Sequence, residues 1–386
     1  MRKDEYFNII DGIKKEYSKG FLKLKEDYVS ILKNYNYDDM RKIMDTHNKL
    51  ICNTIKEVLS YYSELNNINT LIILTGSLAR KTNLLYSDVD INIMYDNKYR
   101  DKYLQIEDQI SYMLASILNY RGRDRIHGIT YYLPIISNIM VDDIQNNHYT
   151  LHFDDGNFEY SVRENAYDTM YNTFNSTRSI KDLEDYLINN QVSFKNWTNV
   201  YENLGDVKEY EKFHHNIKTA EKDNILKCDF DKEQEKLIHT FSNFTSINNE
   251  IEIPIKTLKK IYKEDVLKNM YEFMIYVYKL AIKNGINIEK FDFEEMQDKH
   301  VFEQLNIDTK LYDYFYNYFA LITKLQYTLN SINLDLSKHS LKSVSQDVLN
   351  STEKNIFNDA NFLRELSSSK QEMGVEIKKV LTRRLQ

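Results

Sequence analysis

The chain has 386 residues, which exceeds one average domain, so two or three domains are expected. It contains only 2 prolines and 9 glycines, and so few helix breakers favour long helices and argue against an all-β sandwich. The formal net charge of −7 weighs against non-specific binding of long nucleic acids, although it leaves room for a local basic groove.

The N-terminal segment, residues 1–65, is predicted to be helical. Apolar side chains keep helical spacing from 6 to 17 and again, after a polar break, from 40 to 62. The second of these helices should lead directly into a strand at Thr70. His47 lies in its apolar stripe, and we interpret it as a packed or hydrogen-bonded helix residue rather than as a catalyst.

The most informative stretch, residues 71–95, has the pattern of a strand, a Gly-Ser turn, a short helix and a second strand. Gly76 permits a tight turn or a close backbone approach to a ligand, and Ser77 places a hydroxyl beside it. Asp88 and Asp90 are separated by one residue, so on a strand both carboxylates point to the same face. Adjacent carboxylates repel each other unless a cation lies between them, and hard oxygen ligands suit Mg²⁺. The pattern therefore predicts a magnesium site at these two aspartates.

Shorter elements follow this stretch. An amphipathic helix is expected at 101–119 and a strand at 128–136. Two further short strands are expected at 140–144 and 148–153, and the second of them should end in a turn at Asp154-Asp155-Gly156.

The C-terminal part, residues 251–386, is predicted to be a helical bundle, and the polar segment 191–250 is predicted to be a connector. Apolar side chains form one helical face at 270–281 and another at 311–329. The aromatic residues at 312–319 invite an interpretation as a base-stacking surface. Because they recur at helical spacing, packing inside the bundle is the better interpretation.

The order Gly76-Ser77, ten residues, then Asp88-Val89-Asp90 resembles the signature of the nucleotidyltransferase superfamily. Within that superfamily, residues 76–90 are most similar to the branch of the bacterial PII uridylyltransferases and glutamine-synthetase adenylyltransferases, and to their CBS-linked relatives. Arg80 matches an arginine of that branch, whereas Thr82 stands where the branch often has Glu.

The resemblance implies an α+β fold with a polymerase β-like mixed-sheet core. This core would occupy residues 66–190, flanked by the N-terminal helical segment 1–65 and, after the connector 191–250, by the C-terminal helical bundle 251–386. The helix that contains residues 45–48 resembles one that precedes the core in the CBS-linked relatives.

The resemblance also implies a chemistry. The reaction would transfer NMP from a nucleoside triphosphate such as ATP to an acceptor hydroxyl, with release of pyrophosphate and with Mg²⁺ or Mn²⁺ as the cofactor. Asp88 and Asp90 would be the catalytic and metal-binding residues. Gly76, Ser77 and Arg80 would bind the nucleotide.

Many members of the superfamily use a third carboxylate on a later strand as a metal ligand and general base. The candidates here are Asp142, Asp143, Asp154 and Asp155, and we favour Asp142 because it follows a β-type run. A solvated acid pair at a strand end is an equally good interpretation of Asp142. Arg178 matches an arginine at a helix end in the same branch, where it would pair with phosphate or with a neighbouring acid.

The resemblance implies that the acceptor is a protein side chain such as tyrosine. Transfer to RNA or to a tRNA end is one alternative, and synthesis of a modified small molecule or a cyclic dinucleotide is another. A non-catalytic helical interaction protein with a degenerate core is the non-enzymatic alternative.

Cys52 and Cys228 are the only cysteines, which gives neither a zinc pattern nor a disulfide framework. No run approaches 18 apolar residues, and residues 1–6 lack the apolar core of a signal peptide. We therefore expect a cytoplasmic protein that binds neither zinc nor membranes.

Overall fold

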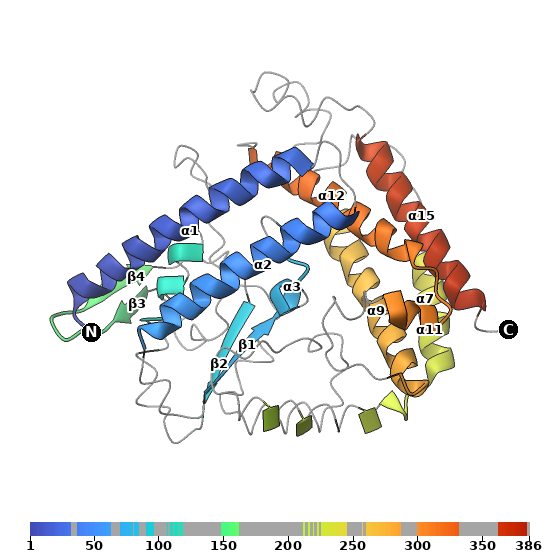
Figure 1. Ribbon diagram of the computed structural model, residues 1–386, viewed down its shortest axis with the longest axis horizontal. Helices are drawn as coiled ribbons and strands as arrows, with labels where there is room; N and C mark the ends of the chain where they lie inside the picture. Colours follow the sequence, from blue (N-terminus) through green and yellow to red (C-terminus); the bar gives the residue numbers. More distant parts are fainter. Residues whose placement is uncertain are drawn as a thin grey trace. The chain divides into compact units, whose positions relative to one another are not determined.

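Figure 1 shows the fold in a computed structural model of the chain. The structure describes residues 1–31, 37–62, 70–79, 81–84, 90–95, 148–161, 225–244, 260–286, 299–331 and 362–383, together with single positions between 106 and 118 and between 211 and 223, and residue 257.

Long helices make up most of the described chain, as the scarcity of proline and glycine predicts. The helices are α1 (Lys3–Ile31), α2 (Tyr37–Ser60), α3 (Gly76–Ala79), α7 (Phe230–Ser242), the π-helical turn η9 (Lys260–Asp265), α9 (Val266–Lys283), α11 (Lys299–Gln304), α12 (Lys310–Ser331) and α15 (Phe362–Arg383). The strands are β1 (Thr70–Thr75), β2 (Asp90–Tyr95), β3 (His148–Leu151) and β4 (Phe158–Ser161). No helix among these described elements has the length and apolar character needed to cross a membrane.

The chain divides into two compact units. Unit 1 comprises residues 1–25, 45–83 and 87–224, and unit 2 comprises residues 26–44, 84–86 and 225–386. Helices α1 and α2 therefore contribute residues to both units.

In unit 1, α1 and α2 each bury one apolar stripe. The buried apolar residues of these stripes are Tyr6, Ile10, Ile13, Tyr17, Phe21 and Leu24 on α1 and Ile51, Cys52, Ile55 and Val58 on α2. A Cβ atom added at Gly20 of α1 would lie 2.8 Å from the Leu50 Cδ1 of α2, so the glycine permits the close approach of the two helices. The ring of His47 lies against Phe21, with centroids 6.1 Å apart, which confirms that His47 is a packed helix residue.

The start of α1 is held in unit 1 by aromatic contacts and by Gln109. The ring centroids of Tyr6 and Phe153 are 4.9 Å apart. The Tyr6 hydroxyl donates to the Gln109 carbonyl at 2.5 Å, and the Gln109 Nε2 donates to the His152 carbonyl at 2.7 Å. The described positions between 106 and 118 are helical, and the residues predicted for the apolar side of a helix are buried at Ile110, Met113, Leu114, Ile117 and Leu118.

Two antiparallel strand pairs are described in unit 1. β1 pairs with β2 in a register that runs from Thr70 opposite Tyr95 to Thr75 opposite Asp90, and β3 pairs with β4. The structure therefore supports a mostly helical chain with small antiparallel sheets. The other strands predicted for the mixed-sheet core lie outside the described residues.

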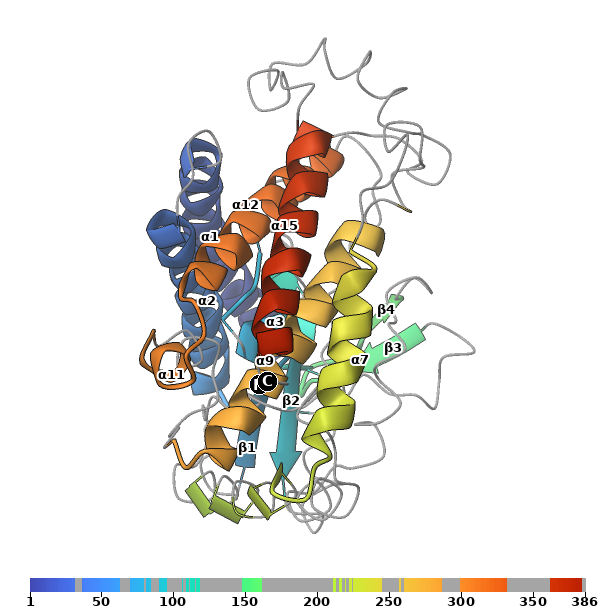
Figure 2. The ribbon, with the colours of Figure 1, turned by 90° about the vertical axis from the view of Figure 1, so that its right-hand side faces the viewer.

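Unit 2 is a helical bundle in which α15 packs against α7 and α12, and α7 packs against α9 (Figure 2). Aromatic side chains fill its core, and those on α9 and α12 that are at most 3% exposed are Phe273, Tyr276, Tyr278, Tyr312, Phe315, Tyr316, Tyr318 and Phe319. The Tyr318 hydroxyl donates to the Tyr262 carbonyl at 2.7 Å. The aromatic residues at 312–319 are thus core residues, as predicted, except for the half-buried Tyr314. Helix α7, which lies within the expected connector 191–250, belongs to this bundle.

Candidate active site

The β1–β2 pair brings the two halves of the predicted motif to one end of a ribbon. Thr75, the last residue of β1, lies directly opposite Asp90, the first residue of β2. Directly opposed residues of an antiparallel pair have Cα atoms roughly 4.5–5.5 Å apart. Because Gly76 follows Thr75, the Gly-Ser turn and the acidic end of the second strand lie side by side.

A tightly bonded turn follows α3. The Thr82 N–H donates to the Ser77 carbonyl at 2.9 Å, and the Lys81 N–H donates to the Leu78 carbonyl at 3.1 Å. These two bonds, with Lys81 in the left-handed region at φ 55°, form a Schellman motif. Glycine usually occupies the left-handed position, and a residue with a side chain costs roughly 1–2 kcal/mol there.

Ser77 is more exposed than the residues that surround it in this turn. Its exposure is intermediate, whereas Leu78 and Thr82 are 1% and 2% exposed. Packing of Leu78 and Thr82 therefore anchors the turn, and Ser77 is the residue among these three that a ligand can reach.

A buried asparagine of α2 contacts the turn at two places. The Asn48 Nδ2 donates to the Leu78 carbonyl at 2.7 Å and to the Asn83 Oδ1 at 3.3 Å. The Cys52 thiol donates to the Asn48 Oδ1, with the two atoms 3.5 Å apart. Reasoning from the sequence did not single out Asn48. The signal that could have found it is a polar residue next to His47, inside an apolar stripe.

The structure brings Gly76, Ser77 and Asp90 together at the end of the β1–β2 ribbon. Outside the described residues lie Arg80, Asp88, Arg178 and the side chain of Asp90.

Of the candidates for a third carboxylate, Asp142 and Asp143 also lie outside the described residues. Asp154 and Asp155 form the predicted turn between β3 and β4 and contact the start of α1. The Lys3 N–H donates to the Asp155 Oδ1 at 2.7 Å, and this bond holds the pKa of the Asp155 carboxyl below its usual value. The structure thus gives Asp155 a role in capping α1.

The donor set of the motif fits a hard divalent cation. Asp88 and Asp90 offer carboxylate oxygens, and the backbone of Asp90 lies beside the turn that carries the Ser77 hydroxyl. Mg²⁺ commonly binds one or two carboxylates together with phosphate oxygens of a substrate. Within the described part of the chain, no three His, Cys, Asp or Glu side chains are placed to hold a metal ion.

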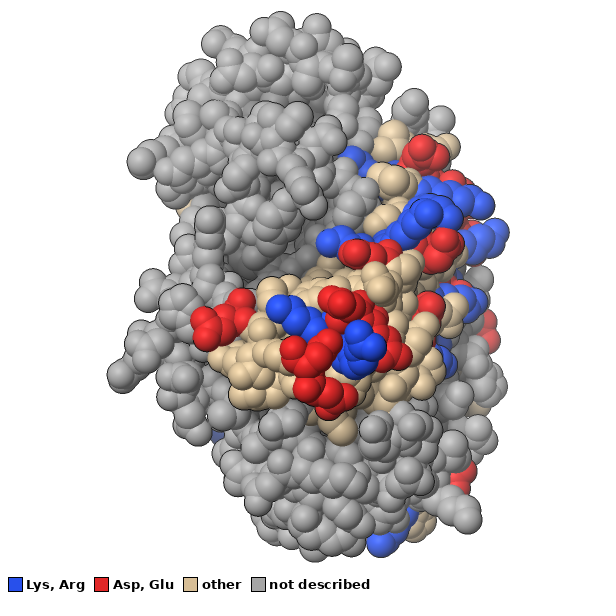
Figure 3. All heavy atoms as spheres, turned by 90° about the vertical axis from the view of Figure 1, so that its left-hand side faces the viewer, with Lys and Arg blue, Asp and Glu red and all other residues tan. Residues whose placement is uncertain are grey.

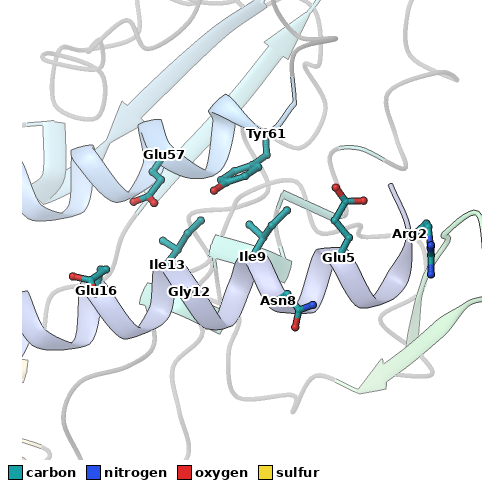
Figure 4. A pocket seen from close by; sticks show the side chains of 9 residues that line it. All are labelled: Arg2, Glu5, Asn8, Ile9, Gly12, Ile13, Glu16, Glu57 and Tyr61. Carbon is teal, nitrogen blue, oxygen red and sulfur yellow. The ribbon is translucent and has the colours of Figure 1, made fainter.

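A separate groove of about 700 Å³ lies between the start of α1 and the end of α2 (Figure 4). Its lining residues are Arg2, Glu5, Asn8, Ile9, Gly12, Ile13, Glu16, Glu57 and Tyr61. Figure 4 shows Glu57 and Tyr61 extending toward α1. A hydrogen bond from the Lys19 side chain lowers the pKa of the Glu16 carboxyl, so this acid is ionised near neutral pH. Three acids in the lining disfavour a triphosphate, and none of the predicted site residues lies there.

The face of the molecule in Figure 3 carries basic and acidic side chains next to one another. Mixing of the two signs weakens any field that would attract a long polyanion. On the described part of this face, the basic side chains form no continuous patch of a single sign.

Residues 51–140 match a family model described as a nucleotidyltransferase domain. The matched range contains β1, the Gly-Ser turn, both aspartates of the motif and β2. A comparison with the curated proteins finds no match. The family match supports a transferase of nucleotidyl groups that takes a nucleotide substrate.

Proposed function

We propose that the protein is a Mg²⁺-dependent nucleotidyltransferase. The observation that carries this proposal is the pairing of Thr75 with Asp90, which puts the Gly-Ser turn beside the acidic strand inside the range that matches the nucleotidyltransferase domain. A turn that can bind phosphate, next to carboxylates that can bind a cation, makes up the two halves of a site for a nucleoside triphosphate.

The reaction is transfer of NMP to an acceptor hydroxyl. The acceptor oxygen forms a bond to the α-phosphorus, the bond from the α-phosphorus to the bridging oxygen breaks, and pyrophosphate leaves with that electron pair. Asp88 and Asp90 would hold Mg²⁺, or Mn²⁺ in its place, and the bound ion would offset charge on the triphosphate and lower the pKa of the attacking hydroxyl.

The chain's own residues bind and orient the nucleotide. Gly76 allows the backbone to approach the phosphates, and the Ser77 hydroxyl donates a hydrogen bond to a phosphate oxygen. Arg80 offsets the negative charge that builds on the leaving group. Asp142 is the candidate general base that takes the proton of the acceptor hydroxyl.

A protein side chain is the proposed acceptor, in a cytoplasmic setting. This part of the proposal is supported by the similarity of residues 76–90 to the branch of the PII uridylyltransferases and glutamine-synthetase adenylyltransferases. RNA ends and small molecules are the competing acceptors.

The test offers the purified protein each of the four NTPs, labelled at the α-phosphate, with Mg²⁺, Mn²⁺ or EDTA. Each reaction is run with the protein alone, with a cell lysate and with RNA. Label on a protein band supports the full proposal, whereas label on RNA or in a small soluble product keeps the transfer reaction and replaces the acceptor.

The matched negative control is the double variant Asp88→Asn, Asp90→Asn. Label transfer by this variant at the wild-type rate would refute the assignment of the site. A wild-type protein that binds none of the four NTPs would favour a non-catalytic interaction protein.

A further inference from the structure

Asn48 lies just outside the range that matches the nucleotidyltransferase domain, yet it contacts the turn that the motif defines. Its side chain is 4% exposed, and a buried amide is unfavourable unless its donors and acceptor find partners. The nitrogen donates to the Leu78 carbonyl and to the Asn83 Oδ1, and the oxygen accepts from the Cys52 thiol. Both ends of the amide are therefore used within unit 1.

These partners determine the orientation of the Asn48 and Asn83 side-chain amides, that is, where each amide places its nitrogen and its oxygen. The Leu78 carbonyl can only accept, so the nitrogen of the Asn48 amide faces it and the oxygen does not. The same nitrogen also points to Asn83, which must therefore present its oxygen. The buried Asn83 Nδ2 has no hydrogen-bond partner in the described part of the chain. The bond from Asn48 is thus what orients the side chain of Asn83.

The two bonds reach both sides of the turn. Leu78 directly follows Ser77, and Asn83 lies on the segment that leads to Asp88. The Leu78 carbonyl also accepts from the Lys81 N–H, so its two lone pairs are both used. The left-handed conformation of Lys81 is one that a residue with a side chain does not favour, so contacts from another element help to hold the turn.

We propose that Asn48 is a positioning residue for the nucleotide-binding turn. Its amide holds Leu78 and Asn83 in place, and it raises the affinity for the nucleoside triphosphate without contacting the nucleotide. The physical reason is preorganisation, because a turn that is already ordered loses less conformational freedom when its ligand binds. This inference rests on the proposed function of the Gly-Ser turn.

The test compares Asn48→Ala and Asn48→Asp with a control variant, Ile55→Val. Asn48→Asp keeps the size of the side chain and removes both donors, whereas Ile55→Val removes one methyl group from a fully buried residue of the same helix. Two quantities are measured at a temperature where all proteins are folded. They are the Kd for ATP, GTP, CTP and UTP with Mg²⁺, by calorimetry, and the hydrogen exchange of the peptide 76–84, by mass spectrometry.

We expect both Asn48 variants to weaken the Kd of the preferred nucleotide about tenfold and to speed exchange in the peptide 76–84. Ile55→Val should change neither quantity. Asn83→Ala should weaken the Kd as well. Its combination with Asn48→Ala should weaken the Kd by less than the sum of the two effects, because the two side chains share one of the bonds that hold the turn.

The possible results separate this inference from the proposed function. If Asn48→Ala and Ile55→Val bind the nucleotide equally well, the positioning role is overturned and the proposed function stands. Faster exchange with an unchanged Kd overturns it in the same way. If the wild-type protein binds none of the four nucleotides, both proposals are overturned.

Discussion

Helices α2 and α9 each bury a long face, but the two faces differ in chemistry. The buried face of α2 in unit 1 includes His47, Asn48 and Thr54 among its apolar residues. The buried face of α9 in unit 2 is apolar or aromatic apart from Lys279. A buried polar group is unfavourable unless it is hydrogen-bonded. Such a group therefore indicates a position where a hydrogen bond to a particular partner takes the place of apolar packing. On the α2 face, Asn48 uses its hydrogen bonds to hold the turn after α3, whereas the buried face of α9 packs into an apolar core.

The largest effect is expected when an acid of the motif in unit 1 is removed. Asp88→Asn and Asp90→Asn, as single variants, should each lower the rate of nucleotidyl transfer by at least about 100-fold, because each removes a charge that stabilises the reacting phosphates. The Tm of the metal-free variants should stay the same or rise, since repulsion between neighbouring carboxylates is relieved. Initial rates and thermal melting without Mg²⁺ check the two parts. A large drop in Tm would mean that these acids are structural.

Truncation of a core side chain in unit 2 should instead lower stability and leave nucleotide affinity unchanged. Phe315 is fully buried, and its ring centroid lies 6.4 Å from that of Phe273. Phe315→Ala should therefore lower the free energy of unfolding by about 3–5 kcal/mol, measured by urea denaturation. Nucleotide affinity in the cold, where the variant remains folded, should be unchanged. Val375→Ala, at a side chain that is 46% exposed on α15, is the control and should have little effect.

Two helical glycines, Gly12 in unit 1 and Gly374 in unit 2, differ in how closely other atoms pack around them. A Cβ atom at Gly374 would lie 2.7 Å from the Phe244 Cβ in unit 2, so Gly374→Ala should destabilise by about 1–3 kcal/mol. A Cβ atom at Gly12 of α1 would meet nothing within 4 Å, so Gly12→Ala should stabilise by about 0.5–1 kcal/mol. Opposite signs of the shift in Tm are expected. The same sign for both would show that helix propensity, rather than close packing, decides at these positions.

Relief of the backbone strain in the turn should stabilise unit 1 modestly. Lys81→Gly places the residue that tolerates φ 55° at the left-handed position of the Schellman motif. The free energy of unfolding should rise by about 1 kcal/mol, since the strain removed exceeds the extra conformational entropy that glycine brings to the unfolded chain. Denaturant titration measures this change. A loss of stability would indicate that the Lys81 side chain contributes more than its strained backbone takes away.

The smallest expected effect is the loss of stability at low pH through Asp155, which caps the start of α1. The bond from the Lys3 N–H lowers the pKa of Asp155 below 3.8, so the folded state favours the ionised carboxylate. The resulting stability is present above the unfolded-state pKa and is lost as the pH falls through the lower, folded-state pKa. The Tm of the wild type should therefore fall slightly more than that of Asp155→Asn between about pH 5 and about pH 3. Parallel melting curves for the two proteins would contradict this role of Asp155.

Local periodicity was enough to predict much of the fold. The stripes of α2 and α12 were predictable because one helical face repeats every three or four residues, and burial decides which residues occupy it. The closeness of Gly76 and Asp90 was also predictable in kind, since a strand, a turn and a second strand can pair locally.

The remaining features depend on contacts that no local pattern encodes. Asn48 reaches the Leu78 carbonyl across 30 residues, and nothing in the sequence of either segment identifies the other. Lys81 occupies the left-handed position at which a glycine would have indicated the turn in the sequence. Helix α7 lies in a polar stretch, and its membership of the bundle depends on bonds such as that from the Gln234 Nε2 to the Leu381 carbonyl, 147 residues away.

The bonds around Gln109 in unit 1 bear on the order in which the chain folds. Gln109 accepts from Tyr6 across 103 residues and from Tyr62 across 47, and it donates to His152 across 43. Contacts at such separations require large loops to close before they contribute, which slows folding. During synthesis, Tyr6 of α1 cannot form its ring contact with Phe153 until the chain has been extended past that residue. The ring of Tyr6 therefore lacks one of its packing partners until more than 140 further residues have been made.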